Sequence, residues 1–97
     1  MPSLHLTVGA QRDLETIMLW YEQCREGLGR DFVDAIDDVL QGILASPNRH
    51  AEVAPGWRRA LSRRFPYGVY YRTETELIWV VAVLHLHRDP DVWSSRT

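Results

Sequence analysis

The stretch "SLHLTV" near the start of the chain alternates apolar and polar residues. Leu4, Leu6 and Val8 have one parity, and His5 and Thr7 have the other. Successive side chains of a strand point to opposite faces, so this pattern predicts a β-strand with one apolar face.

From residue 10 onward, apolar residues recur at spacings of three and four, which is typical of an amphipathic helix. The first stripe comprises Leu14, Ile17, Met18, Tyr21, Cys24 and Leu28. The second stripe comprises Phe32, Ile36, Val39, Leu40 and Ile43. The glycines of "EGLGRD" separate the stripes, and "SPN" at 46–48 ends the second because proline disfavours helix in the residue before it. We therefore expect an αα-hairpin with two helices of about 16 residues each.

Three strand-like segments follow a connector at residues 48–56. Trp57–Phe65 is rich in arginine, Tyr67–Thr73 is rich in aromatic residues, and Leu77–Leu86 is apolar on both faces, which suits a central strand. The predicted order is β-α-α-β-β-β. It describes an N-terminal strand, an αα-hairpin and a three-stranded antiparallel β-meander in a single α+β domain over residues 1–97.

The composition is ordinary for a globular protein, with 45% hydrophobic and 25% charged residues. Cys24 is the only cysteine, which excludes an internal disulfide framework, and its place on the first helical stripe predicts a buried thiol. The longest apolar run, Leu77–Leu84, is far shorter than the roughly 20 residues of a membrane helix. The N-terminus lacks the basic and apolar regions of a signal peptide, so we expect a cytoplasmic protein with no membrane contact.

Positive charge is concentrated in the second half of the chain. Residues 1–54 contain four arginines and nine acidic residues, a balance of −5, whereas residues 55–97 contain seven arginines and four acidic residues, a balance of +3. Arginines interleaved with aromatic residues suit phosphate groups and stacked bases. Arginines on an edge strand also prevent aggregation, and the composition leaves both interpretations open.

His85 and His87 are the candidates for a metal site. On a strand they would point to the same face, but a zinc site usually needs a third protein ligand. Asp89 has the same parity, and Pro90 is expected to break the strand there. The acidic residues of the second helix are expected to form a solvated face, comprising Asp31, Asp34, Asp37 and Asp38. We therefore expect no metal and no cofactor, and a hydrogen-bonded structural role for His87.

Leu19 and Trp20 lie away from the apolar stripe of the first helix. At about 100° per residue, Leu19 falls opposite the stripe and Trp20 falls on its flank. An adjacent pair of exposed apolar residues indicates a surface for a partner protein.

Several motifs occur in a characteristic order along the chain. They are "A-x-x-D-L-x-x-I" (Ala10, Asp13, Leu14, Ile17), Phe32, "S-P" (Ser46, Pro47), "R-R-F-P-Y-G-V-Y-Y" at 63–71, "V-A-V-L-H-L-H-R-D-P-D-V-W" at 81–93, and Arg96. This set resembles the RelE/ParE family of bacterial type II toxin–antitoxin toxins over essentially the whole chain. The resemblance implies a helical hairpin on an antiparallel sheet, and a small toxin silenced by a cognate antitoxin that is usually encoded beside it.

The resemblance implies one of two activities. RelE-like members enter the ribosomal A site and cut mRNA, whereas ParE-like members block DNA gyrase and do not cut nucleic acid themselves. If this chain is a metal-independent endoribonuclease, the residues at the matching places are Arg63, Arg64, His85 and Arg88.

Four features favour the ParE-like branch. The chain has no lysine, and its C-terminal aromatic residue is Trp93, which is unsuited to proton transfer. A pI near 6.0 suits contact with ribosomal RNA poorly. The ending "H-x-x-R-D-P-x-x-W" also looks more like this branch, and its target-binding residues would be Arg88, Trp93 and Arg96. A homologue that binds antitoxin without being toxic is a third alternative.

The antitoxin is the partner that the resemblance implies most directly. Family antitoxins wrap the toxin with a flexible segment that becomes ordered on binding, so we expect a hetero-oligomer with roles in plasmid maintenance or stress response. The residues expected to contact it are Leu19, Trp20, Trp57, Arg59 and Leu61.

Overall fold

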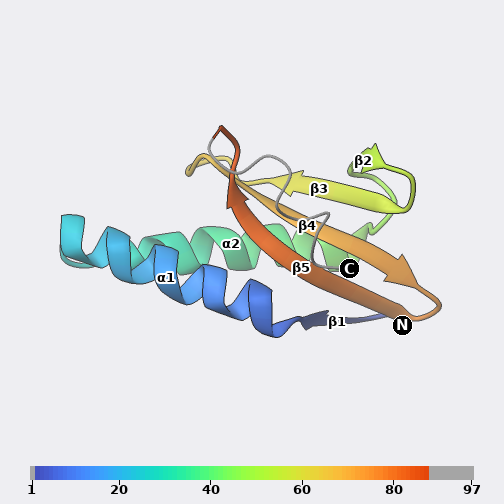
Figure 1. Cartoon of the computed structure of the whole chain (residues 1–97), viewed down its shortest axis with the longest axis horizontal. Coiled ribbons are helices and arrows are strands. Elements are labelled where there is room, and N and C mark those ends of the chain that lie inside the picture. The colour runs from blue at the N-terminus through green and yellow to red at the C-terminus, as the bar shows by residue number, and fades with distance from the viewer. Residues whose placement is uncertain (1, 88–97) are drawn as a thin grey trace.

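Two helices cover one face of a five-stranded sheet (Figure 1). The computed structural model describes residues 2–87. The helices are α1 (Val8–Cys24) and α2 (Leu28–Ala45). The strands are β1 (Ser3–Leu6), β2 (Ala51–Ala54), β3 (Trp57–Leu61), β4 (Tyr67–Glu74) and β5 (Leu77–His85). Neither of these helices is long and apolar enough to cross a membrane.

The strand order across the sheet is β1-β5-β4-β3-β2. The predicted α+β fold is confirmed, including the N-terminal strand, the helical hairpin and the β3–β4–β5 meander. The sheet is mixed rather than antiparallel, because β1 pairs in parallel with β5. Residues 51–54 form a strand inside the predicted connector, since they pair with β3. Hydrophobic periodicity encodes neither strand direction nor such a short edge strand, so the sequence does not indicate these two features.

Two strands end earlier than expected. β3 stops at Leu61 because the chain turns: Ser62 N–H donates to the carbonyl of Tyr67 at 3.0 Å, and Ser62 Oγ accepts from Phe65 N–H at 3.3 Å. β5 stops at His85, one residue before the predicted end.

Side-chain acceptors fix where both helices begin. Thr7 Oγ1 accepts from the N–H of Ala10 at 3.2 Å, which caps α1 and ends the first strand before the alternation does. The carboxylate of Glu22 accepts from the N–H groups of Gly27 and Gly29, both at 3.0 Å. Gly27 has a φ of 86°, in the left-handed region that favours glycine. These bonds satisfy amides at the start of α2 that have no partner within that helix.

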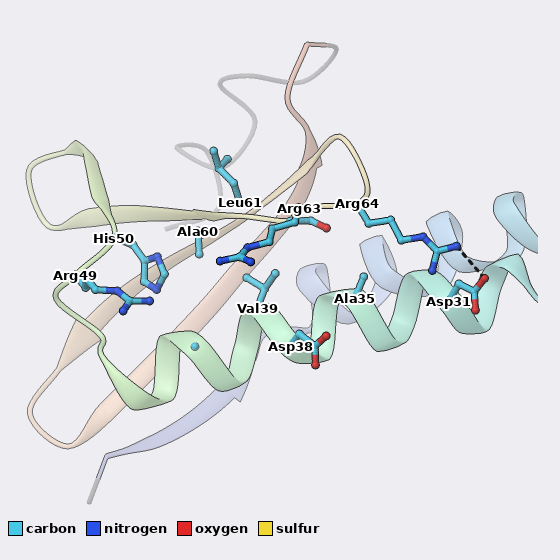
Figure 2. A pocket seen from close by; sticks show the side chains of 12 residues that line it. Asp31, Ala35, Asp38, Val39, Arg49, His50, Ala60, Leu61, Arg63 and Arg64 are labelled. Carbon is cyan, nitrogen blue, oxygen red and sulfur yellow. Dashed lines mark hydrogen bonds and ion pairs between the residues drawn. The ribbon is translucent and has the colours of Figure 1, made fainter.

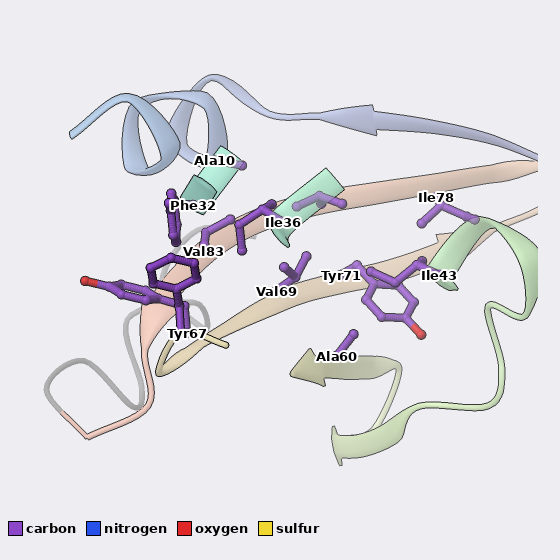
Figure 3. Close-up of a cluster of buried hydrophobic side chains, with 12 residues drawn as sticks. Ala10, Phe32, Ile36, Ile43, Ala60, Tyr67, Val69, Tyr71, Ile78 and Val83 are labelled. Atoms are coloured by element: carbon purple, nitrogen blue, oxygen red, sulfur yellow. The ribbon is translucent and has the colours of Figure 1, made fainter. Parts of the chain in front are cut away.

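The main core lies between the helices and the sheet (Figure 3). Its aromatic rings pack edge to face, with centroids 4.9 Å apart for Tyr21 and Phe65, 5.3 Å for Phe32 and Phe65, and 5.4 Å for Phe32 and Tyr67. The predicted burial of Cys24 is wrong, because Cys24 is exposed. It is the last residue of α1, at the end of the hairpin that projects past the sheet (Figure 1).

A second cluster lies on the opposite face of the sheet, which we call the far face. Its members are Tyr70, Val81, Ala82 and Leu84, with Val53, Ala54, Trp57 and Trp79 packed against them. The predicted burial of β5 on both faces is therefore confirmed. Tyr70 pairs with Ala82 whereas Tyr71 pairs with Val80, so Val81 is the extra residue of a β-bulge.

Candidate functional site

A groove of about 490 Å³ runs between α2 and β3 (Figure 2). Its α2 wall presents the carboxylates of Asp31 and Asp38. The facing residues are basic and comprise Arg49, His50, Arg63 and Arg64. Ala35, Val39 and Ala60 provide apolar surface between them. The groove therefore offers charges of both signs along an apolar floor, which suits a polypeptide segment.

Arg64 is held at the α2 side of this groove. Its Nη2 donates to Asp31 Oδ2 at 3.2 Å, and Arg25 Nη2 lies 3.6 Å from the same oxygen. The guanidinium carbon of Arg64 also lies 5.3 Å from the centroid of the Phe65 ring. Because these groups are partly exposed, each pair contributes little stability, but together they orient Arg64 toward the helices.

Arg58 has a structural role at the opposite end of the groove. Its Nη1 donates to the carbonyl of His50 at 2.6 Å, and its Nη2 lies 3.6 Å from Glu52 Oε2. Burial raises the pKa of the Tyr71 hydroxyl, and the positive charge of Arg58 lowers it in part. Tyr71 donates to the carbonyl of Pro47 at 2.6 Å. Arg58 and Tyr71 thus fasten the segment that joins α2 to β2.

A second pocket, of about 350 Å³, lies between α1 and the ends of β4 and β5. Its α1 wall comprises Arg12, Asp13, Thr16, Ile17 and Trp20. Its strand wall comprises Tyr67, Val83, Leu84 and His85. The rings of His85 and Tyr67 meet edge to face at a centroid distance of 5.3 Å. The exposed Trp20 therefore borders a pocket that continues its apolar surface.

The candidate nuclease residues are distributed over two sites. Arg63 and Arg64 line the groove beside α2, whereas His85 lines the pocket beside α1. Arg88 lies outside the described residues, as do Trp93 and Arg96. The structure therefore does not bring the three described candidates into one pocket.

The residues expected to contact an antitoxin fall on two surfaces. Leu19 and Trp20 are 52% and 54% exposed on α1. Side chains of β3 alternate between the two faces of the sheet, and Ala60 is buried in the main core. The residues of β3 that point to the far face are therefore Trp57, Arg59 and Leu61.

The histidine pair does not have the geometry of two ligands on one strand. β5 ends at His85, and His87 lies in the turn that follows. The backbone N–H of His87 donates to His85 Nδ1 at 3.2 Å. Within residues 2–87, no three histidine, cysteine or acidic side chains are grouped to hold a metal ion. On the acidic face of α2, Asp34, Asp37 and Asp38 are exposed, whereas Asp31 pairs with arginines at the groove.

Two further arginines reach these surfaces through the tertiary structure, and no spacing in the sequence indicates them. Arg72 lies opposite Trp79 on the far face, and Arg49 reaches the groove from the loop after α2. The alternation of β4 and β5 indicates which face each side chain occupies. It does not indicate which residues of different strands become neighbours.

A helical hairpin packed on a five-stranded sheet is the fold that the resemblance to the RelE/ParE family implies. Residues 4–90 match the model of the family described as "ParE toxin of type II toxin-antitoxin system, parDE". The chain therefore belongs to the ParE toxin family of type II toxin–antitoxin systems, which confirms the expected resemblance and its ParE-like branch.

A solved structure shows the same fold. It belongs to the chromosomal ParDE toxin–antitoxin system from P. aeruginosa and superposes with a TM-score of 0.78 at 22% sequence identity. The match covers 88% of this chain and 96% of the other. A comparison with curated protein sequences gives no match.

Proposed function

We propose that this ParE-family chain inhibits DNA gyrase and is neutralised by a cognate antitoxin. Gyrase inhibition is the activity that the ParE-like branch implies. The proposal includes a cytoplasmic location, a hetero-oligomer with the antitoxin, and a role in plasmid maintenance or stress response.

One observation supports inhibition over mRNA cleavage: the separation of the nuclease candidates. Cleavage without a metal needs a base, an acid and cations around one phosphate. Arg64 is turned toward Asp31 on α2, and His85 packs on Tyr67 in a different pocket. An arginine that is already paired with a carboxylate stabilises the negative charge of a transition state less, because the carboxylate partly neutralises its field.

The experiment is a supercoiling assay with purified gyrase, relaxed plasmid and ATP, titrated with the toxin freed of antitoxin. We expect supercoiling to fall, or cleaved DNA to accumulate. Removing residues 93–97 tests the predicted target contacts of Trp93 and Arg96, and Arg88→Gln tests the third. Folded toxin that leaves supercoiling unchanged would contradict the proposal. Ribosomes carrying mRNA would then be assayed, with Arg63→Gln, Arg64→Gln and His85→Gln as the variants.

The antitoxin is proposed to contact the exposed pair Leu19 and Trp20 first. Trp20 borders the pocket between α1 and β5, so an apolar side chain of the antitoxin has a place to enter beside it. Trp57, Arg59 and Leu61 are then reached by the same segment as it continues around the sheet. Leu61 is 50% exposed at the end of β3 and is the most accessible apolar residue of this second group.

A further inference from the structure

Two arginines point toward each other in the groove between α2 and β3 (Figure 2). Arg49 enters from the loop after α2 and Arg63 from the chain that follows β3, and both are exposed. Among the described residues, neither guanidinium forms an ion pair or a hydrogen bond, whereas the neighbouring Arg64 is paired with Asp31. Because like charges repel, an anion bound between Arg49 and Arg63 would be stabilised by both.

The ring of His50 lines the same part of the groove, beside Arg49 (Figure 2). Arg58 donates to the backbone carbonyl of His50 at 2.6 Å, and the Tyr71 ring meets the imidazole edge to face at a centroid distance of 6.2 Å. Nε2 of His50 is buried and has no hydrogen-bond partner within the described part of the chain. Buried polar atoms without a partner are uncommon in folded proteins, so this one makes the groove a candidate for a bound ligand.

Contacts between the two walls close the groove at both ends. Near the start of α2, Arg64 donates to Asp31 at 3.2 Å and bridges the walls (Figure 2). At the other end, the hydroxyl of Tyr71 donates to the carbonyl of Pro47 and fastens the segment that leads from α2 to β2. A polymer that ran the length of the groove would have to displace Arg64 from Asp31. The volume of about 490 Å³ between these ends is that of a small-molecule site.

The remaining surface of the groove suits a ligand with an apolar face and hydrogen-bond donors. Val39 and Ala60 provide the apolar surface, and a Cβ at Gly42 would meet no atom within 4 Å, so space is left there. Asp38 lies one helical turn before Gly42, about 6 Å along α2. Its carboxylate forms no ion pair among the described residues. A carboxylate in a nucleotide site commonly accepts hydrogen bonds from ribose hydroxyls.

We propose that this groove binds a ribonucleoside monophosphate whose phosphate lies between Arg49 and Arg63, beside His50. The ribose hydroxyls donate to Asp38, and the base covers the apolar surface of Val39. A phosphate monoester carries nearly two negative charges at neutral pH and three acceptor oxygens, which matches two guanidinium groups and an imidazole better than a carboxylate does. The inference goes beyond gyrase inhibition and antitoxin binding, and it depends on neither.

The test is calorimetric titration of antitoxin-free toxin at low salt with AMP, 2′-deoxy-AMP and inorganic phosphate. We expect AMP to bind about tenfold more tightly than inorganic phosphate, because only AMP also reaches Asp38 and the apolar surface. We expect 2′-deoxy-AMP to bind about threefold or more weakly than AMP, because it lacks one hydroxyl donor.

The arginines are tested by Arg49→Gln and Arg63→Gln. Each should weaken binding of AMP and of inorganic phosphate by about fivefold or more. Both side chains are exposed, so thermal unfolding should show that the variants keep the fold. Arg30→Gln is the matched control, because Arg30 is an exposed arginine of α2 that pairs with Asp34 outside the groove. It should bind AMP like the wild type.

Asp38→Ala tests the ribose contact separately from the phosphate contact. It should remove the difference in affinity between AMP and 2′-deoxy-AMP, while inorganic phosphate binds at least as well as to the wild type. Asp34→Ala is the control, since Asp34 is exposed on the same helix and does not line the groove. It should leave the difference between the two nucleotides intact.

Three results would overturn the inference. They are no binding of AMP at about 5 mM by folded toxin, equal affinity for AMP and inorganic phosphate, or equal binding of AMP by the wild type and Arg63→Gln. Oligo-rA of about six nucleotides distinguishes a free nucleotide from one in a strand. Tighter binding of oligo-rA than of AMP would replace the proposed ligand with single-stranded RNA. Gyrase and antitoxin are absent from the assay, so its outcome is independent of the supercoiling experiment.

Discussion

The carboxylate of Asp13 accepts a hydrogen bond from the backbone N–H of Val83 at 2.9 Å, joining positions 70 residues apart. β1 pairs with β5 as far as Val80, and the bulge at Val81 follows. Asp13 therefore supplies an acceptor to β5 beyond the point where β1 has ended. This contact gives a structural reason for the aspartate in the motif "A-x-x-D-L-x-x-I".

Asp13→Ala should lower the free energy of unfolding by about 1–3 kcal/mol, because it leaves the Val83 amide without this acceptor. Asp13→Asn should lose less stability, since its amide oxygen can still accept the hydrogen bond from the Val83 N–H. Urea unfolding measures both variants. Glu15→Ala, on the exposed side of α1, is the control and should stay within about 0.5 kcal/mol of the wild type. Equal losses in Asp13→Ala and Glu15→Ala would show that the contact contributes no stability.

Two glycines of α2 should respond in opposite directions to alanine. A Cβ at Gly29 would lie 2.7 Å from the carbonyl oxygen of Met18, so Gly29→Ala must push the helices apart. We expect a loss of about 1–3 kcal/mol. At Gly42 a Cβ meets nothing within 4 Å, so Gly42→Ala should raise stability by about 0.5–1 kcal/mol through helix propensity. Thermal unfolding of the pair checks the signs, and destabilisation by both would contradict the packing described.

The Tyr71 hydroxyl should make the fold sensitive to alkaline pH. Burial raises its folded-state pKa above the unfolded value, so the neutral form is favoured in the fold. The contribution of this hydroxyl to the free energy of unfolding is therefore complete below about pH 10, and it is lost as the pH rises through the raised folded-state pKa. Tyr71→Phe should cost about 1 kcal/mol near pH 8, because it removes the bond to Pro47.

Urea unfolding from pH 8 to 11 measures this dependence. Stability of Tyr71→Phe should fall less steeply above pH 10 than stability of the wild type. Tyr70→Phe, on the far face, serves as the comparison for a general tyrosine effect. Parallel curves for wild type and Tyr71→Phe would exclude Tyr71 as the source of the alkaline loss.

Trp20→Glu should weaken antitoxin binding while the toxin still folds, since the residue is 54% exposed and its replacement puts a charge on an apolar contact. We expect a loss of about tenfold or more in calorimetric titrations. Leu61→Glu tests the far-face part of the proposed contact in the same way. Val8→Glu is the control, since Val8 is 63% exposed at the start of α1. Wild-type affinity in Trp20→Glu would remove that residue from the antitoxin surface.

Local patterns in the chain predicted the helices and strands and the faces that they bury. The spacing of Phe32, Ile36 and Ile43 predicted the buried side of α2, and the unbroken apolar run of β5 predicted a central strand. Both signals are local, because a helix or strand repeats its side-chain direction over a few residues. The ordered motifs similarly indicated the family without any knowledge of contacts.

Which residues become neighbours depends on the folded sheet and cannot be read from these local patterns. Arg63 and His85 are residue types that a nuclease could use, but they line different pockets. Trp57, Arg72 and Trp79 lie side by side on the far face, which no spacing in the chain reveals. Strand order, strand direction and the bulge at Val81 set these relationships. They arise from long-range pairing between backbones, which depends on how the whole sheet assembles rather than on local periodicity.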